Sequence, residues 1–293
     1  MAIENDPVFH RRRLRAGLRK ARENADLTQC QAAWDLGWSL SKLIRIEAGS
    51  VRVAVTDLKA MLALYHVTHD DTVSRLTEAA RGSKNKGGGP WRNPYRDLVT
   101  SPYDWYLGLE RAASSICAMH PSLVPELAQT PDYATGLLPG ARTTAELNHL
   151  TGLRARRQAN LSGEPGPRQL TIILAEEALH RQVSGPAVMR AQLRYLLDIT
   201  GRETATIQIL PFSAGVHPGL LLGPSVLMGF ADPGEDMLFT EDPIGHLVSH
   251  DALYEQDVVA RFSGHFEAMR RLALPGDQAR ALISELIDRL GPG

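Results

Sequence analysis

Apolar residues in the first 80 positions recur at the three- and four-residue spacing of short amphipathic helices. In the first of these helices, Leu14, Leu18 and Ala21 share one face, and arginines crowd the other faces. Further helices are predicted from Thr28 to Leu36, from Leu40 to Ala48, after Thr56 and over about residues 71–81. The pattern predicts an all-α N-terminal region of five helices.

Polar residues and glycines mark the ends of the second and third predicted helices. Thr28 and Ser39 belong to the residue types that cap a helix by accepting a hydrogen bond from a backbone N–H of its first turn. Gly37 suits a tight turn between the two helices, and Gly49 follows the third helix at a position where positive φ is common. We therefore expect two short helices joined by a short turn.

Beyond residue 90, helical patterns are mixed with short β-rich runs. Helices are predicted over Tyr103–Met119, Thr144–Leu161, Pro186–Ile199, Leu253–Leu272 and Gly276–Leu290. Strands are predicted over Gln169–Leu174, Thr204–Leu210, Pro224–Phe230, Met237–Glu241 and His246–Ser249, with a helical turn through Leu179. This order predicts an α+β domain, with a small mixed sheet flanked by helices.

A stretch without apolar residues, from Gly82 to Pro90, has the composition of a flexible linker. We therefore predict one domain at residues 1–81, a linker at 82–90 and a second domain at 91–293. Residues 1–86 hold 15 Lys and Arg against 10 Asp and Glu, whereas the rest of the chain holds 17 against 23. This asymmetry indicates that the first domain binds a polyanion; the alternative is chance variation of surface charge.

Composition excludes several classes of protein. A chain with 43% hydrophobic residues and a net charge of −1 is not disordered over most of its length. Cys30 and Cys117 cannot build a disulfide framework. No apolar run approaches the roughly 20 residues that span a bilayer, and the N-terminus lacks the apolar core of a signal peptide. We expect a soluble, cytoplasmic protein with no membrane contact.

Two short helices joined by a glycine-containing turn within a basic helical bundle are typical of a helix-turn-helix. Its positions are in register in the sequence Leu27-Thr28-Gln29, Ala33, Leu36-Gly37, Ser39, Leu43, Ile46-Glu47 and Gly49. The stretch resembles the XRE type of helix-turn-helix domain over about residues 10–67. The resemblance implies a DNA-binding domain and a structural ion pair between Arg22 and Glu47. A helical bundle that binds protein instead of DNA is the alternative.

The third helix of this motif is expected to enter the major groove of double-stranded DNA. Leu43 and Ile46 anchor it inward, so that its other positions face the bases. There Arg45 could bind guanine in a bidentate manner, and Leu40 could touch a thymine methyl group. Lys42 suits a phosphate. The complete set of predicted DNA-binding residues is Thr28, Gln29, Ser39, Leu40, Ser41, Lys42, Arg45 and Arg52.

Short sequence segments of the second half resemble the C-terminal domain of actinobacterial WhiJ-type regulators over about residues 105–287. They are Leu123-Val124-Pro125, Gln129-Thr130-Pro131-Asp132-Tyr133-Ala134, Arg157-Gln158, Gln192-Leu193 and Leu210-Pro211-Phe212-Ser213-Ala214-Gly215. The resemblance implies a DNA-binding regulator or an antitoxin-like repressor. Such proteins are often paired with a small protein encoded by the neighbouring gene.

Candidate chemistry in the second half is weak. A metal site could use His246 and His250 with Glu241 and Asp251, but the stretch has the pattern of a strand and a turn, where the two rings lie apart. Glu176, Glu177 and His180 could form an acid–base set, but glutamates at a strand end more often cap or pair with an arginine. No phosphate-binding glycine motif or hydrolase elbow occurs. We expect no metal, no cofactor and no enzymatic activity.

The loop from Pro211 to Gly219 is predicted to be a surface for a ligand or partner, with Pro211, Phe212 and His217 as its residues. The alternative is a rigid turn between two strands. Taken together, we expect a transcriptional regulator that acts as a homodimer on a near-palindromic operator. A small-molecule effector or a small protein partner would act on its second domain. The alternative functions are an antitoxin-like neutraliser and, less favoured, an enzyme with a DNA-binding domain.

Overall fold

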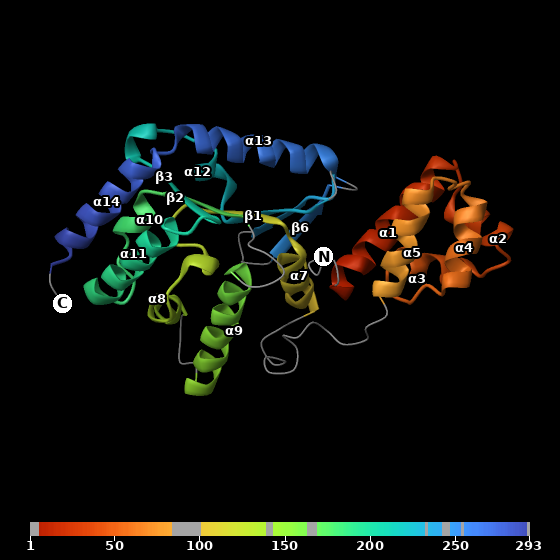
Figure 1. The fold of residues 1–293 in the computed structure, drawn as a ribbon, viewed down its shortest axis with the longest axis horizontal. Coiled ribbons are helices and arrows are strands. Elements are labelled where there is room, and N and C mark those ends of the chain that lie inside the picture. The colour runs from red at the N-terminus through yellow and green to blue at the C-terminus, as the bar shows by residue number, and fades with distance from the viewer. Residues whose placement is uncertain are drawn as a thin grey trace. The chain divides into compact units, whose positions relative to one another are not determined.

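The computed structural model describes residues 6–83, 101–138, 143–162, 169–231, 234–241, 247–252 and 255–291. By its internal contacts the chain divides into two compact units. The N-terminal unit comprises residues 1–93 and 99–112, and the C-terminal unit comprises residues 94–98 and 113–293 (Figure 1). Of the predicted linker, Gly82 and Ser83 are described, at the end of a helix, and the rest lies outside the described residues.

The N-terminal unit is all-α, as predicted, within its described residues. Its helices are α1 (Pro7–Asn24), α2 (Gln29–Asp35), α3 (Leu40–Glu47), α4 (Val55–Leu64), α5 (Asp70–Gly82) and α7 (Ser101–Ala112). The first five correspond to the five predicted helices. They enclose a core of aliphatic side chains, in which Leu18, Leu43 and Leu58 are completely buried. This core holds α2 and α3 against α1, and thereby positions the predicted DNA-binding residues.

Helix α7 packs on α1. The approach is close, because a Cβ atom added to Gly108 would lie 2.8 Å from Cβ of Val8. Asp6 caps α1 by accepting a hydrogen bond of 2.8 Å from the N–H of Val8, and its second carboxylate oxygen lies 3.9 Å from Arg111 of α7. Burial raises the pKa of Asp6 above its ordinary value, against the N–H of Val8 and the charge of Arg111, which lower it.

The C-terminal unit contains a mixed sheet of six strands among the described residues. They are β1 (Ser115–His120), β2 (Gln169–Ala175), β3 (Ala205–Leu210), β4 (Ser225–Gly229), β5 (Met237–Glu241) and β6 (Leu247–Asp251). The strand order is β3-β2-β1-β4-β5-β6. The pairs β1–β2 and β2–β3 are parallel, and the other three pairs are antiparallel. The predicted α+β architecture with a mixed sheet is confirmed.

Helices cover both faces of this sheet (Figure 1). Helix α13 (Gln256–Leu272) packs on one face, where Phe266 and Met269 join Met119, Ile173 and Leu238 in a buried cluster. Helices α11 (Pro186–Thr200) and α14 (Gly276–Arg289) pack on each other and on β3. The connections contain the long helix α9 (Thr144–Ser162) and the short elements η2 (Glu126–Ala128), α8 (Pro131–Gly136), α10 (Glu177–His180), η3 (Phe212–Ala214) and α12 (Gly219–Leu222).

One predicted element is wrong. The sequence predicts a single helix over Tyr103–Met119, but α7 ends at Ala112 and residues 115–120 form the strand β1. Apolar residues at 109, 113 and 116 have helical spacing, which imitates a continuing helix. Residues 115–120 instead gain backbone hydrogen bonds on both sides, to β2 and to β4, and this tertiary pairing overrides the local pattern. The misassigned segment is an inner strand of the sheet.

No described helix combines the length and the apolar character needed to cross a membrane.

Candidate nucleic-acid interface

Local hydrogen bonds define the two helices of the motif and the turn between them. Thr28 accepts a hydrogen bond from the N–H of Gln31, and the side chain of Gln31 returns to the N–H of Thr28 over 2.9 Å. This reciprocal capping box starts α2. Gly37 adopts φ +65° in the turn, a conformation that favours glycine. Ser39 then starts α3 by accepting from the N–H of Lys42 over 3.2 Å.

The inward side of α3 is anchored in the core of the N-terminal unit. Leu43 is completely buried and Ile46 is 2% exposed. Ala33 of α2 is equally buried and has no side chain beyond Cβ, so that α2 and α3 can cross closely. The packing leaves one side of α3 directed away from the core.

The outward side of α3 carries four exposed side chains in succession around the helix: Leu40, Ser41, Ile44 and Arg45. Leu40 is 41% exposed and Ile44 is 43% exposed. Arg45 donates from Nε to the backbone oxygen of Ser41 over 3.3 Å and remains at the surface. We call these four residues the α3 face. Sequence reasoning named three of them and missed Ile44, although its place four residues after Leu40 implies the same side of the helix.

Lys42 is not part of the α3 face. Its Nζ atom lies 3.0 Å from a carboxylate oxygen of Asp57 in α4 and 3.6 Å from the centre of the Trp38 ring. The ammonium group is therefore held by an ion pair and a cation–π contact on the flank of α3. The sequence predicted a phosphate contact for Lys42 and gave no indication that Asp57 or Trp38 would hold its ammonium group.

Glu47, at the end of α3, accepts hydrogen bonds from two helices. Arg22 of α1 donates to both of its carboxylate oxygens, over 2.8 and 3.1 Å, and Gln29 of α2 donates over 2.8 Å. Arg22 also donates to the backbone oxygen of Leu27. The hydrogen bond to Glu47 raises the pKa of Arg22, and burial raises the pKa of neighbouring Tyr65. The network ties α1, α2 and α3 into one rigid body.

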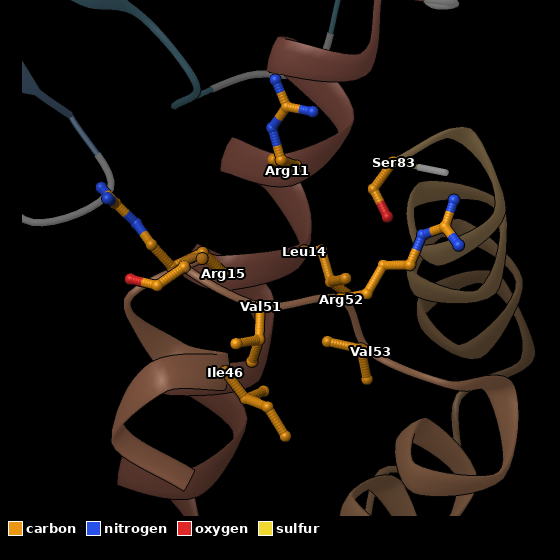
Figure 2. Close-up of a pocket in the computed structure, with 10 residues that line it drawn as sticks. Arg11, Leu14, Arg15, Ile46, Val51, Arg52, Val53 and Ser83 are labelled. Carbon is orange, nitrogen blue, oxygen red and sulfur yellow. The ribbon is translucent and has the colours of Figure 1, made fainter. Parts of the chain in front are cut away.

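A hollow of about 250 Å³ lies beside the end of α3 (Figure 2). Its apolar lining includes Leu14, Ile46 and Val53, and arginines 11, 15 and 52 stand around it. In Figure 2 the guanidinium groups of these arginines point in different directions, and that of Arg52 extends toward Ser83. The hollow therefore does not gather the three charges on one point. Arg52 lies in the loop after α3. There the sequence predicts a contact with the DNA backbone.

The catalytic and metal candidates of the C-terminal unit are described in part. His246 lies outside the described residues, and His250 pairs with Glu255. The described parts of the chain contain no group of three His, Cys, Asp or Glu side chains that could hold a metal ion. Glu176 accepts a hydrogen bond of 2.8 Å from the N–H of Phe212 and lies 3.4 Å from His180, so it holds the loop after β3.

That loop, with α12, forms a segment at residues 211–222 that exposes apolar side chains. Phe212 is 60% exposed, Val216 85% and Leu221 84%. Pro211 is half-buried, whereas His217 is 6% exposed, and burial lowers its pKa against the raising influence of Glu177. Of the three residues predicted to face a partner, only Phe212 is prominent at the surface.

Two family models match the sequence. The helix-turn-helix domain matches residues 13–76, which include α2, α3 and the turn between them. The domain of unknown function DUF5753 matches residues 103–285. No curated protein and no solved structure matches the chain significantly. The first match supports a DNA-binding regulator, and the second covers more than half of the chain. The chain belongs to the DUF5753 family and carries an XRE-like helix-turn-helix domain ahead of that region.

Proposed function

We propose that the protein is a sequence-specific transcriptional repressor of the cytoplasm and nucleoid. The observation that carries the proposal is the α3 face: four exposed side chains on a helix whose opposite side is buried, within a region that matches the helix-turn-helix family. A helix of this kind enters the major groove with its exposed residues against base edges. The excess of basic residues in the same part of the chain favours a polyanionic ligand.

Six of the eight predicted DNA-binding residues have a place in this proposal. Arg45 binds a guanine edge, since it is exposed and its guanidinium can offer two parallel donors. Ser41 hydrogen-bonds a base edge. Arg52 binds a phosphate of the DNA backbone beside the groove. Thr28, Gln29 and Ser39 lie at the starts of α2 and α3, which approach the DNA backbone.

We further propose that two copies bind together. A single helix of this kind contacts few base pairs, so useful specificity requires two copies on a near-palindrome with half-sites about one helical turn apart. The C-terminal unit would then control the pair in response to a protein partner or a ligand, by binding and not by catalysis.

The test is selection of genomic fragments with the purified full-length protein, followed by footprinting of the best site. We expect a protected near-palindrome. Arg45→Ala should weaken binding to it by about 1–3 kcal/mol and relax the preference at one base pair of each half-site. The matched control is Arg289→Ala in α14, which removes the same charge from the C-terminal unit and should leave the affinity unchanged. Recovery of no preferred fragment at moderate salt contradicts the proposed function.

A second candidate, an antitoxin-like protein that neutralises a small partner, is favoured by the exposed apolar side chains of residues 211–222. The full-length protein should then capture the product of the neighbouring gene. The double variant Phe212→Ser/Leu221→Ser should lose that capture and keep DNA binding. Capture that is insensitive to both substitutions would exclude this surface.

A further inference from the structure

The α3 face is unusual in what it offers to a base pair. Two of its four side chains, Leu40 and Ile44, are aliphatic, and both are more than two fifths exposed. They are four residues apart on one helix, so they are neighbours on its surface. A single exposed leucine on a protein needs no explanation. Two adjacent aliphatic side chains on the side of a helix that meets DNA determine which base edges that helix can contact favourably.

Few polar side chains near Leu40 and Ile44 are placed to hydrogen-bond a base edge. Lys42 is held by Asp57 and by the ring of Trp38, on the flank of the helix. Ser41 and Arg45 are the polar members of the α3 face, and they hydrogen-bond each other through Nε of Arg45 and the backbone oxygen of Ser41. The aliphatic pair therefore lies beside one polar pair, and any base pair opposite Leu40 and Ile44 meets hydrocarbon.

In the major groove only one of the four bases carries a methyl group. Thymine presents its C5-methyl group there beside its O4 acceptor, whereas the other three bases present donors and acceptors without a methyl group. A donor or acceptor covered by leucine or isoleucine loses its water without gaining a partner, which is unfavourable. A methyl group covered in the same way is stabilised by removal of apolar surface from water.

We propose that Leu40 and Ile44 read thymine methyl groups, and that the operator carries thymines at the two positions opposite them in each half-site. This inference rests on the proposed function. Four residues of helix rise about 6 Å, and successive base pairs are 3.4 Å apart along a strand. The two thymines therefore lie at adjacent pairs or with one pair between them. Arg45, next to Ile44, places a guanine beside this thymine pair.

The experiment uses the full-length protein and the operator recovered by selection. Each thymine of a half-site is replaced in turn by uracil, which removes the methyl group and leaves the hydrogen-bonding edge unchanged. Two such positions should weaken binding about fourfold each, the factor that corresponds to about 0.8 kcal/mol per buried carbon. Replacement by 5-bromouracil, whose bromine is similar in size to a methyl group, should restore the affinity.

Side-chain truncation identifies the reader of each methyl group. Leu40→Ala should abolish the difference between thymine and uracil at one position, and Ile44→Ala at the other. Both residues are exposed, so neither change empties the core, and circular dichroism should be unaltered. Leu272→Ala is the matched control: Leu272 is 44% exposed in the C-terminal unit, and its truncation should leave both uracil effects intact.

The outcomes separate the inference from the function. If selection recovers no preferred site, the proposed function fails and this inference fails with it. If a site is recovered and uracil has no effect at any position, the protein is a regulator that does not read methyl groups. If the uracil effects persist unchanged in Leu40→Ala and Ile44→Ala, the thymine preference arises from DNA shape, and the assignment to these side chains is overturned.

Discussion

The two units of the chain each bury an arginine that pairs with a glutamate, and the two pairs differ in the exposure of the carboxylate. In the N-terminal unit the side chain of Arg22 is 9% exposed and that of Glu47 only 3%. In the C-terminal unit Arg157 of α9 is 1% exposed, but its partner Glu126 in η2 is 45% exposed. The Glu126 side chain is therefore partly open to solvent, whereas the Glu47 carboxylate is enclosed by its protein donors.

This difference indicates how each pair is used. Glu47 lies at the end of the helix that carries the α3 face, and its donors come from α1 and α2. The pair therefore sets the orientation of the proposed reading surface. Glu126 joins η2 to α9 through Arg154 and Arg157, within the connection between β1 and β2. Its role is to hold α9 on η2, and solvent can replace part of it.

The largest expected effect is the loss of Arg22. Substitution of Arg22 by methionine leaves the Glu47 carboxylate buried with Gln29 as its remaining described donor, which should destabilise the N-terminal unit by about 3–5 kcal/mol. Arg157→Met should cost the C-terminal unit only about 1–2 kcal/mol, because Glu126 keeps Arg154 and water. Hydrogen–deuterium exchange of peptides from α3 and α9 measures the two units separately in the full-length protein.

Two results would break this comparison. Equal losses in the two variants would show that exposure of the carboxylate does not decide the cost. The control for a packing defect is the double variant Arg22→Met/Glu47→Leu, which removes both charges and should recover much of the lost protection. A double variant as unstable as Arg22→Met would mean that lost packing, and not the unpaired charge, dominates.

The second prediction concerns pH and the C-terminal unit. Burial on its own raises the pKa of Glu126, but the charges and hydrogen bonds of Arg157 and Arg154 outweigh burial and lower it from 4.5 to about 2. A group whose pKa is lower in the folded state stabilises that state above the unfolded pKa. This contribution is lost as the pH falls from about 5 through 2.

Because nearly half of Glu126 is exposed, solvent screening reduces its contribution to about 1–2 kcal/mol. The free energy of unfolding of the C-terminal unit should fall by that amount between pH 6 and pH 2, beyond the fall seen in Glu126→Gln. Glu285→Gln, in an exposed pair on α14, is the control and should show the full wild-type dependence. An identical dependence in Glu126→Gln and the wild type would remove Glu126 as its source.

Sequence predicts best what local chemistry decides. Thr28, Ser39 and Gly37 mark the two helices and their turn because a cap and a positive φ depend on residues within one helical turn. The architecture of the C-terminal unit also follows from its alternating patterns. The strand β1 does not, because its partners β2 and β4 are more than 50 residues away along the chain and its spacing imitates a helix.

The candidate site shows the same limit at the level of side chains. The outward positions of Arg45, Leu40 and Ser41 follow from helical periodicity once Leu43 and Ile46 face inward. Helical periodicity places Ile44 on the same outward side. This position was missed because aliphatic residues are expected to be buried. The position of Lys42 has no local signal, since Asp57 belongs to another helix and only the packing of α4 brings it near.

The smallest expected effect distinguishes two roles of Lys42. Its ion pair with Asp57 is partly exposed, at 35% and 28%, so Asp57→Asn should cost about 0.5 kcal/mol of stability or less. If the released ammonium then reaches a phosphate, DNA affinity should rise at low salt. The slope of log affinity against log salt should steepen by about 0.9, the value for one additional phosphate contact.

If the Trp38 ring alone keeps Lys42 in place, the slope should stay constant, and Lys42 serves to brace α3 against α4. Lys59→Ala, an exposed lysine of α4 without a role in this contact, calibrates the effect of a change of one charge. Titration of the selected operator at four salt concentrations with the wild type, Asp57→Asn and Lys59→Ala therefore decides whether Lys42 binds DNA or supports the residues that do.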